Sequence, residues 1–236
     1  MRVGAIVAAA GLGTRLGRGS KALVPLRGRT TLARAVGLFL ALDEVSSIVV
    51  VGPSNRLDQV RREVESLAAG KPIQVCAGGD SRQQSVRAGL QALGDCDYVL
   101  VHDAARPLAS AALTRRVLQA AVESGAAFPG VSPRDAVKRV EANRLVESLD
   151  RSRLVLAQTP QGFGYQVLVK AHFEAFDAGL AGDDDAQLVA ATGHPVTVVQ
   201  GEATNIKLTT AEDLEVLEAL LRESEEQPAL PGRPGA

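Results

Sequence analysis

Short apolar runs alternate along most of the chain with stretches in which apolar positions recur every three or four residues. The runs read as buried strands, which we expect at Ala5–Ala9, Ser46–Gly52, Tyr98–Asp103 and Pro195–Gly201. The intervening stretches read as amphipathic helices, as in the series Leu57, Val60, Val64 and Leu67. Strands and helices in this order predict a mostly parallel twisted sheet with helices on both faces, an α/β fold.

In a parallel sheet of this kind, ligands bind beyond the carboxyl ends of the strands. The loops that follow Ala9, Ala77, His102 and Gly201 are therefore the expected positions of a binding site.

One segment departs from the alternation of strands and helices. Residues 134–148, "RDAVKRVEANRLVES", alternate briefly, turn at Glu141–Arg144 and alternate again, with few apolar side chains. We expect a polar β-hairpin that projects from the domain. A two-stranded ribbon is only marginally stable alone, so it should pack on something else, such as a second subunit.

No repeat or linker divides the chain. We expect one domain over residues 1–223, with an arm at about 132–155, and a disordered tail at 224–236, where proline and glycine are frequent.

Composition narrows the function classes. Of the 236 residues, 46% are hydrophobic and 22% charged, which is typical of a globular protein, and the net charge of −1 offers no overall attraction to nucleic acids or membranes. The two cysteines, Cys76 and Cys96, have no metal-site spacing and suit a reducing cytoplasm. Arg2 and the apolar residues after it imitate a short signal peptide. A buried strand followed at once by cations explains the same residues, so we expect a cytoplasmic protein without a membrane span.

The first strand runs into a glycine-rich loop, "AAAGLGTRLGRGSK", at residues 8–21. A dinucleotide-binding fingerprint would need a third glycine where Leu16 stands, and an acidic residue well before Asp43. A P-loop would need Gly-Lys-Ser/Thr at the end of the loop, which is also missing. Neither NAD binding nor P-loop chemistry is therefore expected.

The loop and the segment after it are basic instead. They carry Arg15, Arg18, Lys21, Arg27, Arg29 and Arg34 without an acidic residue. Backbone N–H groups in such a loop bind anions, so the segment could hold phosphates. A tight turn followed by solvated surface cations explains the residues equally well.

Further motifs decide between these readings. The opening "AAAGLGTRL" resembles nucleotidyltransferases, and "GGDSRQQSVRAGL" (78–90), "VLVHDAARP" (99–107) and "NIKLTTAEDL" (205–214) resemble the 2-C-methyl-D-erythritol 4-phosphate cytidylyltransferases of the non-mevalonate isoprenoid pathway. "SPRDAVKRV" and "ESLDRSRLVLAQTPQGF" match the arm of that family and the segment after it. The resemblance runs from about residue 3 to residue 222 and implies a Rossmann-like nucleotidyltransferase fold.

The resemblance implies a reaction between CTP and a polyol phosphate. The phosphate monoester attacks the α-phosphorus of CTP and pyrophosphate leaves, forming 4-diphosphocytidyl-2-C-methyl-D-erythritol. Because the nucleophile is already an anion, cations and Mg²⁺ are needed rather than a general base. It also implies a homodimer held through the arm. Because the chain ends soon after the last motif, we expect one reaction step rather than a fused cyclase.

The family's site residues carry over to matching positions of this chain. The resemblance implies catalytic cations at Arg15, Lys21 and Lys207. It implies a nucleotide site at Ala9, Ala10, Gly11, Gly13, Gly79, Asp80, Ser85 and Asp103, with Asp103 also binding Mg²⁺ and cytosine read between Gly79 and Ser85. It implies substrate contacts at Arg106, Arg151 and Thr209, with Arg151 reaching the other subunit's site.

Two departures from the family's pattern bear on these roles. Thr204 stands where relatives commonly carry a second carboxylate, so metal binding would depend on Asp103 and the phosphates. Ala136 stands where relatives often have threonine, which puts one substrate contact in doubt.

Structural explanations compete with some of these roles. Asp103 could cap a helix or turn, Ser85 could start a helix, and Arg151 could pair with Asp150. The histidines are scattered without ligand spacing, with His102 structural, and the run 183–185 reads as solvated acids or a helix cap.

Two alternatives to the expected activity stay open. One is a ribitol-5-phosphate cytidylyltransferase, whose motifs are close, and the other is a non-catalytic nucleotide-sensing domain. The segments "DAARP" and "NIK" favour the isoprenoid enzyme over the first alternative. The joint presence of Arg15, Lys21, Asp103 and Lys207 favours catalysis over sensing.

Overall fold

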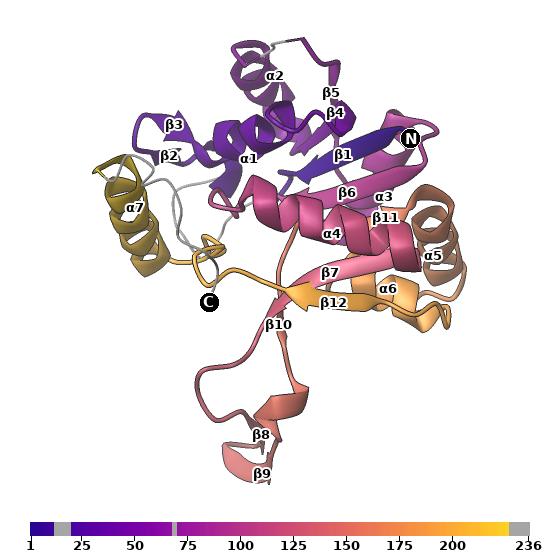
Figure 1. Cartoon of the computed structure of the whole chain (residues 1–236), viewed down its shortest axis with the longest axis vertical. Coiled ribbons are helices and arrows are strands. Elements are labelled where there is room, and N and C mark those ends of the chain that lie inside the picture. Colours follow the sequence, from indigo (N-terminus) through magenta and orange to yellow (C-terminus); the bar gives the residue numbers. More distant parts are fainter. Residues whose placement is uncertain (12–19, 68–69, 227–236) are drawn as a thin grey trace.

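The computed structural model describes residues 1–11, 20–67 and 70–226, which form a mixed, mostly parallel sheet covered by helices (Figure 1). In the described residues this sheet has the order β10-β7-β11-β6-β1-β4-β5, with β12 also paired to β7. Its strands are β1 (Val3–Ala8), β4 (Val45–Gly52), β5 (Ile73–Ala77), β6 (Tyr98–Asp103), β7 (Ala126–Val131), β10 (Leu156–Ala157), β11 (Gln161–Gly164) and β12 (Thr197–Gln200). The short strands β2 (Pro25–Leu26) and β3 (Arg29–Thr30) pair with each other.

The helices correspond to amphipathic stretches, and all but the last pack on the main sheet. They are α1 (Thr31–Leu40), α2 (Leu57–Glu65), α3 (Arg82–Leu93), α4 (Ala111–Ser124), α5 (Tyr165–Asp177), α6 (Asp185–Ala191) and α7 (Ala211–Glu226). Single 3-10 turns lie at η2 (Lys21–Leu23), η3 (Ser54–Arg56) and η4 (Arg151–Arg153). In Figure 1, α1 and α4 lie in front of the sheet and α3 lies behind it.

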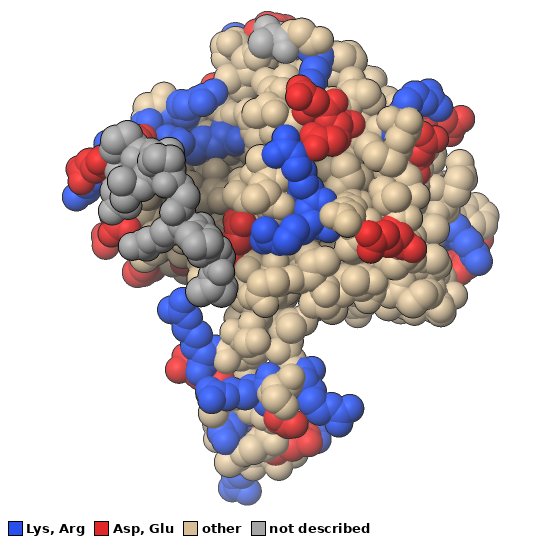
Figure 2. Space-filling view, in the orientation of Figure 1, with Lys and Arg blue, Asp and Glu red and all other residues tan. Residues whose placement is uncertain are grey.

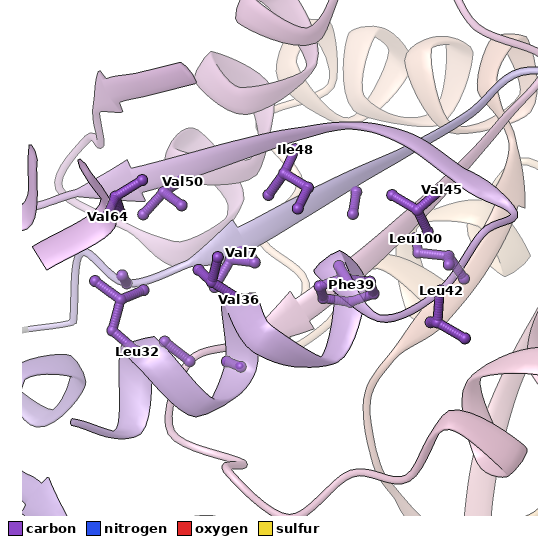
Figure 3. Close-up of a cluster of buried hydrophobic side chains, with 14 of the residues drawn as sticks. Val7, Leu32, Val36, Phe39, Leu42, Val45, Ile48, Val50, Val64 and Leu100 are labelled. Carbon is purple, nitrogen blue, oxygen red and sulfur yellow. The ribbon is translucent and has the colours of Figure 1, made fainter. Parts of the chain in front are cut away.

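The two faces of the sheet are lined by alternate residues of the central strands. On β1, Val3, Ala5 and Val7 join a core beneath α1, α2 and α4, whereas Ile6 joins the core beneath α3, α5 and α6. Figure 3 shows the first of these cores, with Val36 and Phe39 of α1 packed against the strands. Strands buried on both faces read as continuous apolar runs, which is why the sequence revealed them.

A third, smaller core attaches the last helix to the rest of the domain. Leu214, Leu217 and Leu221 of α7 pack with Leu26 of β2 and with Leu208. This contact places the segment before α7 beside the loop that follows β6, since the Leu208 N–H donates to the Ala105 carbonyl at 2.8 Å.

The strand order creates a crevice beside β1. The chain runs from β1 to β4 and β5 on one side, then crosses to β6 on the other side of β1. Both β4 and β6 pair with β1 in parallel, with Ala8 opposite Asp103 in register. The carboxyl ends of β1 and β6 therefore lie side by side where the chain connections change from one side of β1 to the other, which is where α/β sheets bind ligands.

The structure confirms the predicted fold class and the four predicted strands, with small shifts at their ends. The sequence did not predict that β11 runs antiparallel to both of its neighbours, β6 and β7. α7 continues to Glu226, three residues into the expected tail, and Arg27 forms an ion pair with Glu225 at 2.8 Å. Residues 227–236 lie outside the described part of the chain.

The predicted hairpin is also confirmed. It consists of β8 (Lys138–Glu141) and β9 (Arg144–Ser148), joined at Ala142 and Asn143, whose φ angles of 46° and 62° give the left-handed turn that hairpins favour. The hairpin projects from the domain (Figure 1) and carries many basic side chains (Figure 2). Every residue of both strands is exposed.

Within the described residues, no helix combines the length and the apolar composition needed to cross a membrane.

Two helical glycines should respond oppositely to the same substitution. In Gly37→Ala of α1, the nearest neighbour of the new methyl group is an Arg29 side-chain nitrogen at 3.8 Å, so greater helix propensity should stabilise the fold by about 0.5–1 kcal/mol. In Gly89→Ala of α3, the methyl group would lie 2.7 Å from Ile6 Cγ2 and 2.9 Å from Val51 Cγ2. Overpacking should exceed the helical gain, with a net loss on the order of 1 kcal/mol. Urea unfolding of both variants measures the two signs, and stabilisation by Gly89→Ala would contradict the close approach of α3 to the sheet.

Candidate functional site

A cavity of about 620 Å³ opens at the carboxyl ends of β1 and β6. Among the described residues, its lining consists of Ala8–Gly11, Lys21–Ala22, Pro53–Asn55, the stretch from Gly78 to Arg82 with Ser85, Asp103–Ala105, and Lys207. The cavity therefore brings together nine of the residues expected from the sequence: Ala9, Ala10, Gly11, Lys21, Gly79, Asp80, Ser85, Asp103 and Lys207. Gly13 and Arg15 lie outside the described residues.

Glycine at position 78 lets two loops of the cavity wall approach each other. A Cβ atom on Gly78 would lie 2.6 Å from Ala10 Cβ and 2.7 Å from Ser85 Oγ. The Gly79 N–H donates to Ser85 Oγ at 3.2 Å, and Ser85 Oγ donates to the Ser81 carbonyl at 2.8 Å. Ser81, not Ser85, caps α3. Ser85 thus holds the loop from inside the first turn of α3.

The carboxylate of Asp103 lies between two cations. Oδ2 accepts a hydrogen bond from Lys207 Nζ at 2.6 Å, and Oδ1 accepts one from Arg82 Nε at 3.0 Å. Burial by itself would raise the pKa of Asp103, but Arg82 and Lys207 outweigh burial and hold the pKa well below its usual range. Asp103 is therefore ionised at neutral pH. It is not the cap of the following helix, because Ser110 caps α4.

Arg82 contacts a second carboxylate behind the cavity. Its Nη1 donates to Asp185 Oδ2 at 2.7 Å, and Asp185 Oδ1 accepts from His172 Nε2 at 2.9 Å. Burial would lower the pKa of Arg82, but Asp185 and Asp103 together raise it above its ordinary value. The interpretation of residues 183–185 was wrong for Asp185, which is fully buried rather than solvated. It was right for Asp184, whose side chain caps α6.

A buried network positions Lys207 over the cavity. The Asn205 side chain donates to the Thr159 carbonyl at 2.8 Å, and the Asn205 backbone carbonyl accepts from Arg106 Nη1 at 2.7 Å. Gln158 adds a hydrogen bond to the Glu202 carbonyl at 2.8 Å. These contacts explain the "NIK" motif, because Asn205 anchors the loop that carries the lysine two residues later.

The expected substrate residues lie elsewhere. Arg106 directs its Nη atoms to the carbonyls of Asn205 and Ala157, and Thr209 Oγ1 donates to the Lys207 carbonyl. Arg151 Nη1 donates to the Arg134 carbonyl at 2.8 Å within the arm, whereas Asp150 accepts from Ser152. Among the residues that the structure describes, none of Arg106, Thr209 and Arg151 lines the cavity.

The histidine interpretation holds for His102. Its ring is fully buried and lies between Thr159 Oγ1, at 2.9 Å from Nδ1, and the Arg106 carbonyl, at 3.0 Å from Nε2. The carbonyl can only accept, so Nε2 carries the proton and Nδ1 accepts from the Thr159 hydroxyl. Burial, the largest influence, lowers the pKa of His102 to about 4, so the ring is neutral at pH 7 and braces the end of β6.

Sequence reasoning missed part of the cavity wall. Residues 53–55 follow β4, and the rule that ligands bind at carboxyl ends would have found them. Arg82 belongs to the motif at residues 78–90 but was not predicted as a site residue. Its position directly after Ser81, the N-cap of α3, could have indicated it. Nothing in the sequence pairs Arg82 with Asp185, which is 103 positions away.

The cavity offers few metal ligands. In the described part of the chain, no group of three or more His, Cys, Asp or Glu side chains is placed to hold a metal ion. Thr204 is exposed, and the nearby carboxylate of Glu202 is engaged with Ser110 and Arg116. Asp103 and Asp80 are the carboxylates that line the cavity, so a metal ion there would need further ligands from a bound anion.

Comparisons with known proteins agree with this geometry. The family model for 2-C-methyl-D-erythritol 4-phosphate cytidylyltransferase (IspD) matches residues 3–223. A protein of that name from Geobacillus thermodenitrificans is 40% identical over 223 residues, covering 94% of this chain and 97% of its own length. The crystal structure of the protein of that name from Thermus thermophilus superposes with a TM-score of 0.78 at 37% identity, covering 94% of this chain and all of that one.

Some relatives are longer than this chain. A bifunctional enzyme IspD/IspF from Anaeromyxobacter dehalogenans is 46% identical over 224 residues, covering 93% of this chain. The match spans 57% of that bifunctional relative.

Proposed function

The chain belongs to the 2-C-methyl-D-erythritol 4-phosphate cytidylyltransferase family, and we propose that the cavity beyond β1 and β6 is where its two substrates react. The chain is a cytidylyltransferase. It transfers CMP from CTP to 2-C-methyl-D-erythritol 4-phosphate, releasing pyrophosphate and forming 4-diphosphocytidyl-2-C-methyl-D-erythritol for isoprenoid synthesis. The observation that supports this site best is the ionised carboxylate of Asp103 between Arg82 and Lys207, in a cavity that Lys21 also lines.

The residues present suit phosphoryl chemistry between two anions. An oxygen of the monoester forms a bond to the α-phosphorus of CTP, and the bond from that phosphorus to the pyrophosphate oxygen breaks. Lys21 and Lys207 reduce the repulsion between the reactants and stabilise charge on the phosphorus centre. The loop at Gly79–Ser85, held by the first turn of α3, reads the cytosine. Arg15 is expected to add a further cation from outside the described residues.

We propose Mg²⁺ as the cofactor, bound together with CTP rather than before it. Asp103 and Asp80 are the carboxylates that line the cavity among the described residues, and Asp103 already contacts two cations. This small ligand set fits a metal ion that takes most of its ligands from phosphates and water. Asp103 would hold it, and the ion would supply positive charge to the triphosphate. Lys207 can turn from Asp103 to a phosphate because its side chain is 43% exposed.

We also propose a homodimer held through the arm, which we define as residues 132–155. Both strands of its hairpin are exposed, including Val140 (55%), Leu145 (63%) and Val146 (48%). Exposed apolar side chains on a two-stranded ribbon suit a partner that would cover them. Arg151 lies in this arm with an exposed guanidinium, whose Nη1 contacts the Arg134 carbonyl. Released from that contact, it can bind a phosphate by two parallel hydrogen bonds in the partner's cavity.

A cytoplasmic location remains part of the proposal. It rests on the two free thiols of Cys76 and Cys96 and on the need for CTP.

Pyrophosphate release tests the activity. With CTP and Mg²⁺, we expect release with 2-C-methyl-D-erythritol 4-phosphate to be roughly tenfold or more faster than with ribitol 5-phosphate, because a site shaped for one alcohol leaves polar groups unpaired with the other. Faster release with ribitol 5-phosphate would favour the ribitol enzyme. No release with either, despite CTP binding, would favour a sensing domain. Lys21→Ala should lower kcat by roughly 10²–10³-fold, whereas the exposed surface variant Lys170→Ala should not change it.

Titration calorimetry tests the metal proposal. The protein alone should bind Mg²⁺ weakly, and a non-hydrolysable CTP analogue should increase the affinity, because the phosphates supply most ligands. Asp103→Asn should abolish most turnover and raise the Mg²⁺ concentration needed for half-maximal rate. The matched control is Asp58→Asn, because the Asp58 side chain is 82% exposed and does not line the cavity. Tight Mg²⁺ binding without the nucleotide analogue would contradict the proposal.

Mixing two impaired variants, at a concentration of the alcohol phosphate well below the raised KM, tests the shared site. Arg151→Ala should raise KM for the alcohol phosphate more than KM for CTP. Mixed in equal amounts with Lys21→Ala and allowed to exchange subunits, it should recover about a quarter of the wild-type activity, since half of the dimers are mixed and each holds one intact site of two. No recovery after mass spectrometry has shown subunit exchange would place Arg151 outside the partner's site.

A further inference from the structure

One guanidinium joins the cavity to a buried carboxylate that the proposed reaction does not use. Arg82 is the first residue of α3, and Asp185 is the first residue of α6. Arg82 Nε contacts Asp103 at 3.0 Å on the cavity side, and Nη1 contacts Asp185 at 2.7 Å on the other side. The Arg82 side chain is 23% exposed, whereas that of Asp185 is fully buried.

Asp185 is itself held in place from several directions. His172 of α5 donates to its free oxygen at 2.9 Å. The helix that begins at Asp185 is tied to β11, since Gln161 accepts from the Ala186 N–H at 3.1 Å and donates to Asp184 at 2.9 Å. The carboxylate is therefore a fixed point of the fold, although no atom of Asp185 lines the cavity among the residues described.

We propose that Asp185 is a positioning residue for the transfer reaction, acting through Arg82. Asp185 accepts a hydrogen bond from Nη1 of the Arg82 guanidinium. This contact fixes the direction in which Nε of the same group donates to Asp103. Asp103 in turn receives Lys207 on its other oxygen. The inference rests on the proposed function, because its main readout is turnover.

The charges of this group decide what the loss of Asp185 should do. Arg82, Lys207, Asp103 and Asp185 carry two positive and two negative charges. Asp185→Asn would leave one uncompensated positive charge beside the cavity, and Arg82 could then turn toward a bound triphosphate. CTP binding should not weaken, but Asp103 and Lys207 should lose their fixed arrangement. The signature of positioning is thus a lower kcat with KM for CTP unchanged or lower.

Steady-state kinetics of Asp185→Asn tests the proposal. We expect kcat to fall about 10–100-fold, as is typical when a residue that orients a functional group is lost. In an Arg82→Met background, the same change Asp185→Asn should alter kcat less than about twofold, because Asp185 has no other route to the site. Equal effects of the Asp185 substitution in both backgrounds, or a rise in KM for CTP as the main effect, would overturn the proposal.

Two variants separate positioning from stability. Asp184→Ala removes the cap of the same helix and its contact with Gln161, so it should lower Tm while leaving kcat unchanged. If Asp185→Asn does not fold, the double variant Arg82→Met with Asp185→Leu replaces both charges by apolar groups, which buried pairs commonly tolerate. This variant should fold and have a kcat as low as Arg82→Met alone. A double variant with wild-type kcat would overturn the proposal.

Nuclear magnetic resonance gives a readout that does not depend on turnover. The Arg82 Nε–H of the wild-type protein should give a sharp, slowly exchanging ¹⁵N signal, assigned by its absence from Arg82→Met. The signal should broaden or exchange rapidly in Asp185→Asn but persist in Asp184→Ala. A signal unchanged in Asp185→Asn would overturn the inference, whereas a wild-type protein inactive on 2-C-methyl-D-erythritol 4-phosphate would overturn only the proposed function.

Discussion

The site depends on one buried carboxylate kept ionised by cations from two distant parts of the chain. A lone charge at the end of β6 would be costly to bury, and its protonation would be the simplest relief. Arg82 and Lys207 prevent this by each taking one oxygen of Asp103. The opening of α3 and the segment before α7 must therefore meet at β6, and this requirement links elements that are far apart in the sequence.

The fold meets this requirement with two kinds of interaction. Apolar packing on both faces of β1, β4 and β6 sets the sheet and brings the carboxyl ends of the strands to one edge. Buried hydrogen bonds then set the loops. Asn205 holds the loop of Lys207, and neutral His102 connects β6 to Thr159. Polar groups in such positions are costly unless paired, so each pairing favours one arrangement of the loops over others.

The arm is held by other interactions than the domain, because no residue of the arm belongs to the hydrophobic cores of the described chain. Its hairpin is held by its own strand pairing, a left-handed turn and surface ion pairs such as Arg139 with Glu147 at 2.8 Å, a kind of interaction that contributes little at an exposed position. The domain's cores are closed without it. The proposed partner subunit would supply contacts that the arm does not make within its own chain, and Arg151 would then contact the partner's cavity.

The sequence by itself determined the features that depend on local pattern. Apolar runs buried on both faces marked the central strands, the polar alternation at 134–148 marked the hairpin, and the motifs at 78–90, 99–107 and 205–214 marked most of the cavity wall. It could also exclude a dinucleotide fingerprint, because that fingerprint has fixed spacing. Only the tertiary structure decided which side chains meet. The antiparallel course of β11, the burial of Asp185 and its pairing with Arg82 arise from contacts between residues far apart in sequence, and local periodicity carries no information about such contacts.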